Sequence, residues 1–177
     1  IDHGFVVQRK NQVVGQLVAG IGMQMKKNHV EVVAAEGTIM GKKDGIISLS
    51  AAGRTYEGKR LLIATGSMPI LPPIPGVKEG VAAGFVLTNR EVLDLQEIPG
   101  TFVIVGGGVI GLEMASYFNS VGSKVTVVEM LDKIAGPNDR EISEILQKNY
   151  EKKGVVFKLS CKVTAIGTDS VTFEENG

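Results

Sequence analysis

FVIVGGGVIG, Phe102–Gly111, places an apolar strand directly before a glycine-rich turn. Its glycines at Gly106, Gly108 and Gly111 satisfy the dinucleotide pattern G-x-G-x-x-G. The first permits a tight turn off the strand, the second lets a pyrophosphate approach the backbone, and the third lets the next helix pack closely. The diphosphate then lies on free N–H groups at the helix N-terminus. The predicted dinucleotide contacts along this turn are Gly106, Gly107, Gly108, Val109, Ile110 and Gly111.

The residues after this turn complete a βαβ unit. A helix is predicted over Val109–Val121 and a second strand over Lys124–Glu129. The helix face predicted to be buried carries Ile110, Met114, Tyr117 and Val121. Glu129 follows Gly111 by 18 positions (129 − 111), close to the ~20 expected for the acid that binds the ribose 2′-hydroxyl. This context turns a weak motif into a specific one.

Glu129 also selects the cofactor. A carboxylate accepts hydrogen bonds from a ribose diol but repels a 2′-phosphate, so NAD is predicted rather than NADP. Lys133 follows closely and is predicted to be a solvated surface charge.

Composition limits the other function classes. Nineteen Lys and Arg balance nineteen Asp and Glu, so no electrostatic signal points to nucleic acid or to an anionic membrane. No apolar stretch approaches the ~20 residues that span a bilayer, and a reducing cytoplasm is the expected compartment. The single cysteine, Cys161, excludes an internal disulfide and is expected to be a small core residue. With two histidines, metal chemistry is not expected.

The first half of the chain reads as a helix followed by short strands. The helix is predicted over residues 6–27, and strands over Val30–Ala34, Ile46–Leu49 and Leu61–Ala64. Turns are predicted at residues 41–45 and 51–54, and a connector over the proline-rich residues 69–75.

The last part of the chain reads as one helix and three strands. Asn138 is predicted to cap the helix, with Glu141 reaching back to it. The helix is predicted to bury Ile142, Ile145 and Leu146 and to end at Gly154, before strands over residues 155–159, 162–166 and 170–173. The predicted fold class is α/β, in two units that divide just beyond the proline-rich segment.

A second signature lies forty residues before the glycine turn. The run Leu61–Pro69 is an apolar strand that ends in Ala64-Thr65-Gly66-Ser67. Its distance from Gly106 makes the chain resemble the flavoprotein disulfide reductases, which are pyridine nucleotide-disulfide oxidoreductases, and within them the dihydrolipoamide dehydrogenase branch. Further stretches carry the resemblance: Val30–Gly37, Leu87–Leu93, Gly108–Glu113 and Val127–Glu129.

The resemblance implies a Rossmann-like three-layer FAD/NAD(P)-binding fold with FAD and NAD as cofactors. It also implies two partial nucleotide-binding domains, an FAD-binding one at residues 1–96 and an NAD-binding one at residues 97–177. By it, Ala64, Thr65, Gly66 and Ser67 form the turn that closes the FAD domain against the flavin. Gly37 contacts the adenosine, Glu113 lies near nicotinamide and flavin, and Val163 lines the adenine pocket. Each of these last three has a structural alternative: a turn glycine for Gly37, the helix dipole for Glu113 and core packing for Val163.

The function implied is that of an internal piece of a dihydrolipoyl dehydrogenase, which oxidises a protein-bound dihydrolipoamide and passes hydride through FAD to NAD. The expected partners are a lipoyl-carrying protein and a second subunit in a homodimer. The family's first FAD fingerprint, its cysteine pair and its His-Glu base do not occur in these 177 residues. We therefore expect this chain to be inactive alone. The alternatives are a related NADH-dependent disulfide or mercuric reductase, and a non-catalytic NAD(H)-binding module.

Overall fold

The computed structural model describes residues 1–175, in two compact units. One unit contains residues 1–9 together with the chain from Pro69 onward, and the other is Lys10–Met68. These units separate at residue 69, whereas the two nucleotide-binding domains were predicted to meet at residues 96 and 97. That domain boundary stays a prediction, and the last two residues of the second predicted domain lie outside the described residues.

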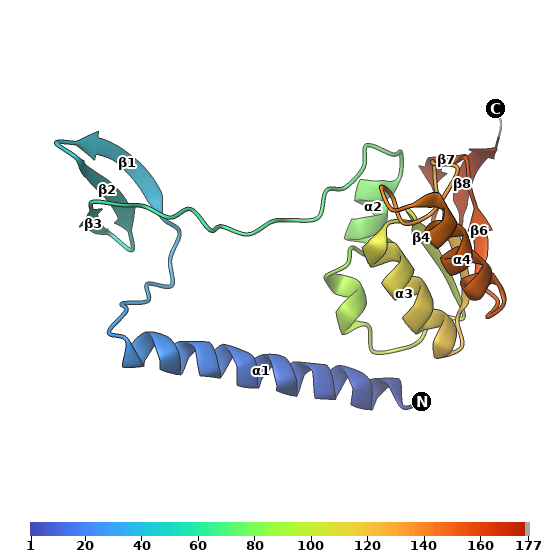
Figure 1. Cartoon of the computed structure of the whole chain (residues 1–177), viewed down its shortest axis with the longest axis horizontal. Coiled ribbons are helices and arrows are strands. Elements are labelled where there is room, and N and C mark those ends of the chain that lie inside the picture. Colours follow the sequence, from blue (N-terminus) through green and yellow to red (C-terminus); the bar gives the residue numbers. More distant parts are fainter. Residues whose placement is uncertain (176–177) are drawn as a thin grey trace. The chain divides into compact units, whose positions relative to one another are not determined.

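The first unit is built on a three-stranded parallel sheet (Figure 1). Its strands lie in the order β4 (Thr101–Val105), β5 (Lys124–Val128) and β6 (Val156–Lys158). Helix α3 (Val109–Ser120) joins β4 to β5, and Val105 pairs with Val128 where the two strands end. The predicted βαβ unit is confirmed, and with it the α/β fold class.

The core of this unit lies between α3 and the sheet. Leu112, Ala115 and Phe118 are the buried residues of α3, and their spacing of three places them along one helix face. Phe118 packs on Phe102 of β4 with ring centroids 4.5 Å apart. The predicted face is therefore displaced, because Ile110 is 54% exposed. Its other predicted members, Met114, Tyr117 and Val121, are partly buried against the same core.

The first two turns of helix α1 (His3–Lys27) also belong to this unit. His3 is buried, with Nδ1 2.8 Å from the Tyr117 hydroxyl and Nε2 2.9 Å from the Leu95 carbonyl. Both imidazole nitrogens are therefore satisfied, and the start of α1 is tied to α3. Over residues 1–175 no helix, α1 included, is both long and apolar enough to cross a membrane.

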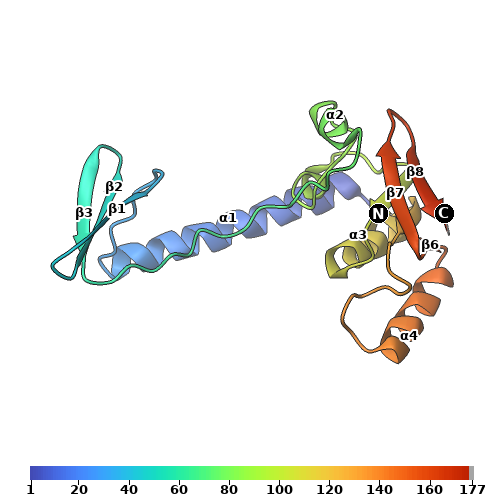
Figure 2. The same cartoon turned by 90° about the horizontal axis from the view of Figure 1, so that it is seen from above.

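The same unit contains further short helices and strands. The short helix α2 (Val77–Ala82) follows the proline-rich segment, and a 3-10 turn spans Glu91–Asp94. Strands β7 (Cys161–Ile166) and β8 (Val171–Glu175) pair antiparallel (Figure 2). The strands predicted at the C-terminal end, β6 included, are confirmed.

Helix α4 (Arg140–Glu151) begins at a different cap from the predicted one. Asp139 accepts the Glu141 N–H through its side chain at 2.9 Å. The Asn138 side chain instead donates to the Ala135 carbonyl at 2.8 Å. This register buries Ser143, which is 1% exposed, and leaves Ile142 60% exposed. Ile145 is exposed as well, so only Leu146 of the predicted stripe packs inward.

Replacing Asp139 with alanine is expected to lower the free energy of unfolding by about 1 kcal/mol, because α4 loses its side-chain cap. The matched change Asn138→Ala removes a hydrogen bond within the preceding loop and is expected to destabilise less. Urea unfolding of both variants and the wild type measures the difference. A larger loss from Asn138→Ala would restore Asn138 as the cap.

The second unit is a three-stranded antiparallel meander joined to the remainder of α1. Strand β2 (Ile46–Ala51) pairs with β1 (Thr38–Lys43) on one side and with β3 (Arg54–Gly58) on the other. Each hairpin has a two-residue turn in which both residues have positive φ: Asp44-Gly45 at 50° and 81°, and Ala52-Gly53 at 50° and 72°. Such turns match the twist of paired strands.

Two predicted strands are wrong. Val30–Ala34 and Leu61–Ala64 form no strand, and among the described residues none pairs with them. Leu62 is 87% exposed and Ile63 66% exposed. An apolar run has strand propensity, but it forms a strand only where a partner strand satisfies its backbone N–H and C=O groups.

Candidate nucleotide site

The glycine turn leaves β4 with the geometry that a bound phosphate requires. Gly106 has φ of 105°, and its N–H donates to the Val128 carbonyl at 2.8 Å. Gly108 is the N-cap of α3 and offers no side-chain cap hydrogen bond. The first N–H groups of the helix therefore have neither an intrahelical partner nor a capping side chain. This is the arrangement that accepts an anion.

Gly108 and Gly111 differ sharply in the space around them. A Cβ atom at Gly111 would lie 2.3 Å from the Gly106 carbonyl oxygen and 3.2 Å from the Ile104 side chain. A Cβ atom at Gly108 would meet nothing within 4 Å. Gly111 thus allows helix and strand to approach, as predicted, while the space over Gly108 is open for a ligand.

Glu129 follows the last residue of β5, and its carboxylate is fixed by two backbone groups. Oε2 accepts the Gly107 N–H at 2.6 Å, and Oε1 accepts the Leu131 N–H at 2.7 Å. Each carboxylate oxygen has a second lone-pair direction for a further donor. The side chain is therefore held at the glycine turn with capacity left to accept a diol.

A cavity of about 650 Å³ brings three predicted site residues together. Gly106, Glu129 and Val163 all line it. Val163 lies in β7 and is 7% exposed, packed with Val128 and Cys161. It is thus both a core residue and part of the cavity wall. The proline-rich segment also lines this cavity, through Pro72, Pro73, Ile74 and Pro75.

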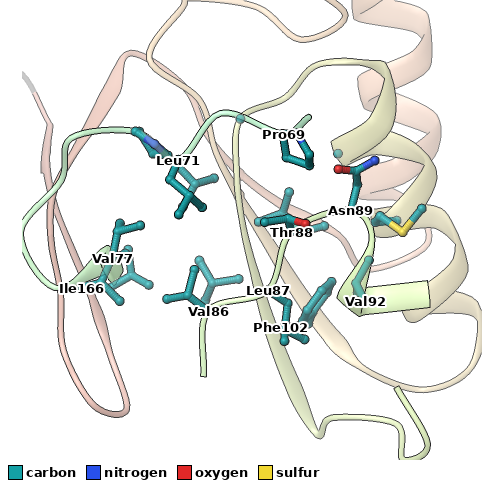
Figure 3. A pocket seen from close by; sticks show the side chains of 18 of the residues that line it. Pro69, Leu71, Val77, Val86, Leu87, Thr88, Asn89, Val92, Phe102 and Ile166 are labelled. Atoms are coloured by element: carbon teal, nitrogen blue, oxygen red, sulfur yellow. The ribbon is translucent and has the colours of Figure 1, made fainter. Parts of the chain in front are cut away.

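The same turn also lines a second cavity, of about 720 Å³, and Figure 3 shows part of its wall. Its lining includes Gly106, Gly108, Val109, Ile110 and Gly111. Leu71, Val86, Leu87 and Phe102 make much of the remaining wall apolar, and Thr88 and Asn89 add polar groups. Gly106 therefore lines both cavities, each of which is large enough for part of a dinucleotide.

The remaining predicted site residues are not brought to these cavities. Glu113 is exposed on α3 and lines neither of them. The predicted FAD contacts belong to the second unit, where the turn at Gly66 has φ of 73°. Gly37 approaches the Leu49 side chain closely, since a Cβ atom there would lie 3.4 Å from it. The roles of Gly37, Glu113 and the run Ala64–Ser67 stay predictions.

Sequence reasoning missed the organisation of the loop after β5, residues 130–139. Lys133 is half-buried, and its Nζ donates to the carbonyls of Gly136 and Asn138. Arg140 Nη2 donates to Asp132 Oδ2 at 2.7 Å. This guanidinium holds the pKa of Asp132 below its usual range, and Asp132 raises the pKa of Arg140. The charge pattern of Asp132, Lys133 and Arg140 was visible in the sequence, but not its pairing.

Cys161 is buried and free, as a core cysteine was predicted to be. Its Sγ donates to the Leu159 carbonyl at 3.2 Å. Burial, with a smaller contribution from the Glu175 carboxylate, raises the pKa of the thiol.

Because the thiolate is the reactive form, we expect Cys161 in the native chain to react slowly with an aromatic disulfide reagent at pH 8. The rate is expected to rise with pH above 9 and to become fast in denaturant. Absorbance of the released thiolate follows the reaction. Complete modification of the native chain within seconds at pH 8 would contradict this burial.

Comparison with known proteins identifies a family and several relatives. The family model for pyridine nucleotide-disulphide oxidoreductase matches residues 2–177. The dihydrolipoyl dehydrogenase of Acholeplasma laidlawii is 39% identical over 176 residues, which cover 99% of this chain and 51% of that protein. The dihydrolipoamide dehydrogenase of Chaetomium thermophilum is 40% identical over 162 residues, or 90% of this chain and 31% of that protein.

The chain is also similar to a solved structure. The HOCl-induced flavoprotein disulfide reductase RclA from Escherichia coli superimposes with a TM-score of 0.83 at 28% identity. The match covers 99% of this chain and 40% of that one. The present chain therefore spans about half, or less, of the length of the relatives it matches.

Proposed function

Because the chain belongs to the pyridine nucleotide-disulphide oxidoreductase family, we propose that it provides the NAD(H) site and part of the FAD site of a dihydrolipoyl dehydrogenase. Similarity to proteins named dihydrolipoyl dehydrogenase along nearly the whole chain supports this choice within the family. The family is named for a pyridine nucleotide and RclA is named a flavoprotein, which agrees with NAD and FAD as the predicted cofactors.

The observation that carries the proposal is the position of Glu129. Its carboxylate lies at the glycine turn, held by the N–H groups of Gly107 and Leu131. In this arrangement Glu129 accepts the ribose hydroxyls and the start of α3 takes the pyrophosphate. The cavity containing Val163 takes the adenosine, and the cavity beside Ile110 takes the nicotinamide half. A 2′-phosphate meets the Glu129 charge and is disfavoured.

In the complete enzyme, dihydrolipoyl thiols on a carrier protein are the reductant, NAD is the hydride acceptor, and FAD stands between them. The partners in this proposal are that lipoyl-carrying protein and a second identical subunit, in the cytoplasm. A single buried thiol, Cys161, cannot form the redox disulfide that this reaction needs. This chain therefore contributes nucleotide binding and positioning, and not the thiol chemistry.

A second candidate is a related disulfide or mercuric reductase, which the structural similarity to RclA favours. These enzymes would share the NAD(H) site proposed here, so the choice depends on the dithiol partner and not on this site. A non-catalytic NAD(H)-binding module is the third candidate.

Calorimetric titration of the purified chain with NADH and, in parallel, NADPH tests the proposal. Selective binding of NADH is expected. Binding of neither nucleotide would remove the proposed site, and equal binding of both would remove the role of Glu129 in selection.

Replacing Glu129 with alanine is expected to weaken NADH binding about tenfold to a hundredfold, because the ribose hydroxyls lose a charged acceptor worth roughly 1.5–3 kcal/mol. Glu97→Ala is the matched control, since Glu97 is an exposed carboxylate that lines neither cavity. Calorimetry on both variants gives the comparison. An equal affinity in Glu129→Ala and Glu97→Ala would exclude Glu129 from the site.

A further inference from the structure

The proline-rich segment lines both cavities of the proposed NAD(H) site. Pro72 and Ile74 line both of them, whereas Pro73 and Pro75 line only the cavity proposed to take the adenosine. Three of these four residues are prolines, whose rings fix φ and leave the backbone little freedom. The Ile74 N–H donates to the Pro72 carbonyl at 2.8 Å, which closes a tight turn inside the segment. This part of the cavity lining is therefore conformationally restricted by its own sequence.

A hydrogen bond and apolar packing attach this segment to β7. The Ile166 N–H donates to the Pro75 carbonyl at 2.9 Å. Ile74 packs against the buried cluster that contains Val163, and Val163 is the residue of β7 predicted to line the adenine pocket. The lining from the proline-rich segment and the lining from β7 are thus fixed relative to each other.

Gly76, directly after the proline-rich segment, makes this close approach possible. A Cβ atom at Gly76 would lie 1.9 Å from the Ile166 carbonyl oxygen and 2.9 Å from its carbonyl carbon. The oxygen belongs to the backbone, so the contact is relieved only if the segment moves away from β7. Gly84 gives a comparison, because a Cβ atom there would meet nothing within 4 Å. Both glycines have positive φ, 86° at Gly76 and 72° at Gly84, so they differ in the contact and not in the backbone region.

We propose that Gly76 is a positioning residue for the adenosine end of the dinucleotide, and that Pro73 supplies an apolar face on which the adenine ring packs. This inference rests on the proposed NAD(H) site. Pro73 lines the same cavity as Glu129, the proposed acceptor of the ribose hydroxyls. A flat aromatic base gains from burying its faces against apolar groups, and a proline ring has no side-chain rotamer freedom to lose when the base binds.

The first test compares Gly76→Ala and Gly84→Ala with the wild type. Each chain is titrated with AMP and with reduced nicotinamide mononucleotide, the two halves of NADH. Gly76→Ala is expected to bind AMP about tenfold more weakly, because the displaced segment no longer covers the base. Its affinity for the nicotinamide half is expected to fall much less. Gly84→Ala has a similar positive-φ strain and is expected to bind both halves as the wild type does.

Pro73→Ala tests the same inference without adding an atom to a crowded position. It removes two ring methylene groups and is expected to weaken AMP binding about fivefold. Binding of the nicotinamide half is expected to stay unchanged, because Pro73 lines only the adenosine cavity. Pro69→Ala is the matched control, since Pro69 lines only the other cavity (Figure 3). This control is expected to bind AMP with wild-type affinity.

The outcomes separate this inference from the proposed function. If the wild type binds NADH and Gly76→Ala binds AMP as tightly as Gly84→Ala does, Gly76 has no positioning role and the proposed function stands. Equal losses of both halves in Gly76→Ala would indicate a general disturbance and would also overturn the positioning role.

If Gly76→Ala does not fold, the comparison of Pro73→Ala with Pro69→Ala decides. Equal AMP affinities in these two variants would remove Pro73 from the adenine pocket and overturn the inference. A wild type that binds NADH without detectable affinity for AMP would overturn it as well, because the adenosine cavity would then contribute no recognition. Absence of NADH binding in the wild type would overturn both proposals.

Discussion

The Gly111→Ala chain is expected to bind no NADH and to unfold with about 2 kcal/mol less free energy than the wild type, the range typical of overpacking. An added Cβ would lie 2.3 Å from the Gly106 carbonyl oxygen. The oxygen belongs to the backbone and the Cβ is attached directly to it, so neither can rotate away. The contact is relieved only if α3 moves away from β4 or the turn at Gly106 changes. Either movement displaces the N–H groups that would hold the pyrophosphate.

Gly108→Ala is the matched control for this prediction. The same methyl group at Gly108 meets no atom within 4 Å, and the φ of −73° there suits any residue. This variant is expected to unfold at the wild-type temperature while binding NADH more weakly, because the methyl group occupies the approach of the pyrophosphate. Thermal unfolding and calorimetry on both variants make the comparison. A Gly111→Ala chain as stable as Gly108→Ala would contradict the close approach of α3 to the turn.

Replacing Phe118 with alanine is expected to lower the free energy of unfolding by about 3–5 kcal/mol, the range for truncating a buried aromatic side chain. Phe118 is 2% exposed and its ring centroid lies 4.5 Å from that of Phe102 and 5.2 Å from that of Tyr117. The change leaves a cavity between α3 and the sheet, which these rings cannot fill without leaving their own contacts.

Ile142→Ala is the control for Phe118→Ala. Ile142 is 60% exposed on α4, so its truncation is expected to change stability by about 0.5 kcal/mol or less. Urea unfolding followed by circular dichroism measures both. If Ile142→Ala lowered the free energy of unfolding nearly as much as Phe118→Ala, Ile142 would be a core residue, as the sequence pattern predicted.

The parts of the fold that sequence predicted well are those specified by local chemistry. Three sequence features predict the βαβ unit from Thr101 to Val128: an apolar strand, a close approach of helix to turn that requires glycine at position 111, and an acid at a fixed sequence distance from that glycine. Glu129 was predicted at the site from its spacing alone, and the structure holds its carboxylate at the glycine turn.

The errors arise where the outcome depends on distant partners. The run Leu61–Ala64 has the composition of a buried strand, yet no described residue pairs with it. The meander strands β1 and β3 are largely exposed, so they lack the alternation that marks a half-buried strand. In the sequence, the hairpins were indicated by their two-residue turns, Asp44-Gly45 and Ala52-Gly53.

Competing local choices explain the remaining differences. Asn138 and Asp139 are both good N-cap residues. Asp139 becomes the cap because the Asn138 side chain already donates to the Ala135 carbonyl in the preceding loop. The buried Ser143 interrupts the expected apolar stripe because its hydroxyl donates to the Asp139 carbonyl at 2.9 Å. The contact of Asn138 depends on the path of the loop before α4, and that of Ser143 follows once the helix begins at the Asp139 cap.

The two hydrogen bonds that fix Glu129 have a consequence for how fast and how tightly a nucleotide is captured. The carboxylate loses its rotamer freedom when the domain folds, through the N–H groups of Gly107 and Leu131. In the proposed NAD(H) site, an incoming ribose would therefore meet a preorganised acceptor and would order no further side chain on arrival. Recognition of the sugar would then be a rigid-body encounter, with selectivity set by a side chain that folding has already fixed.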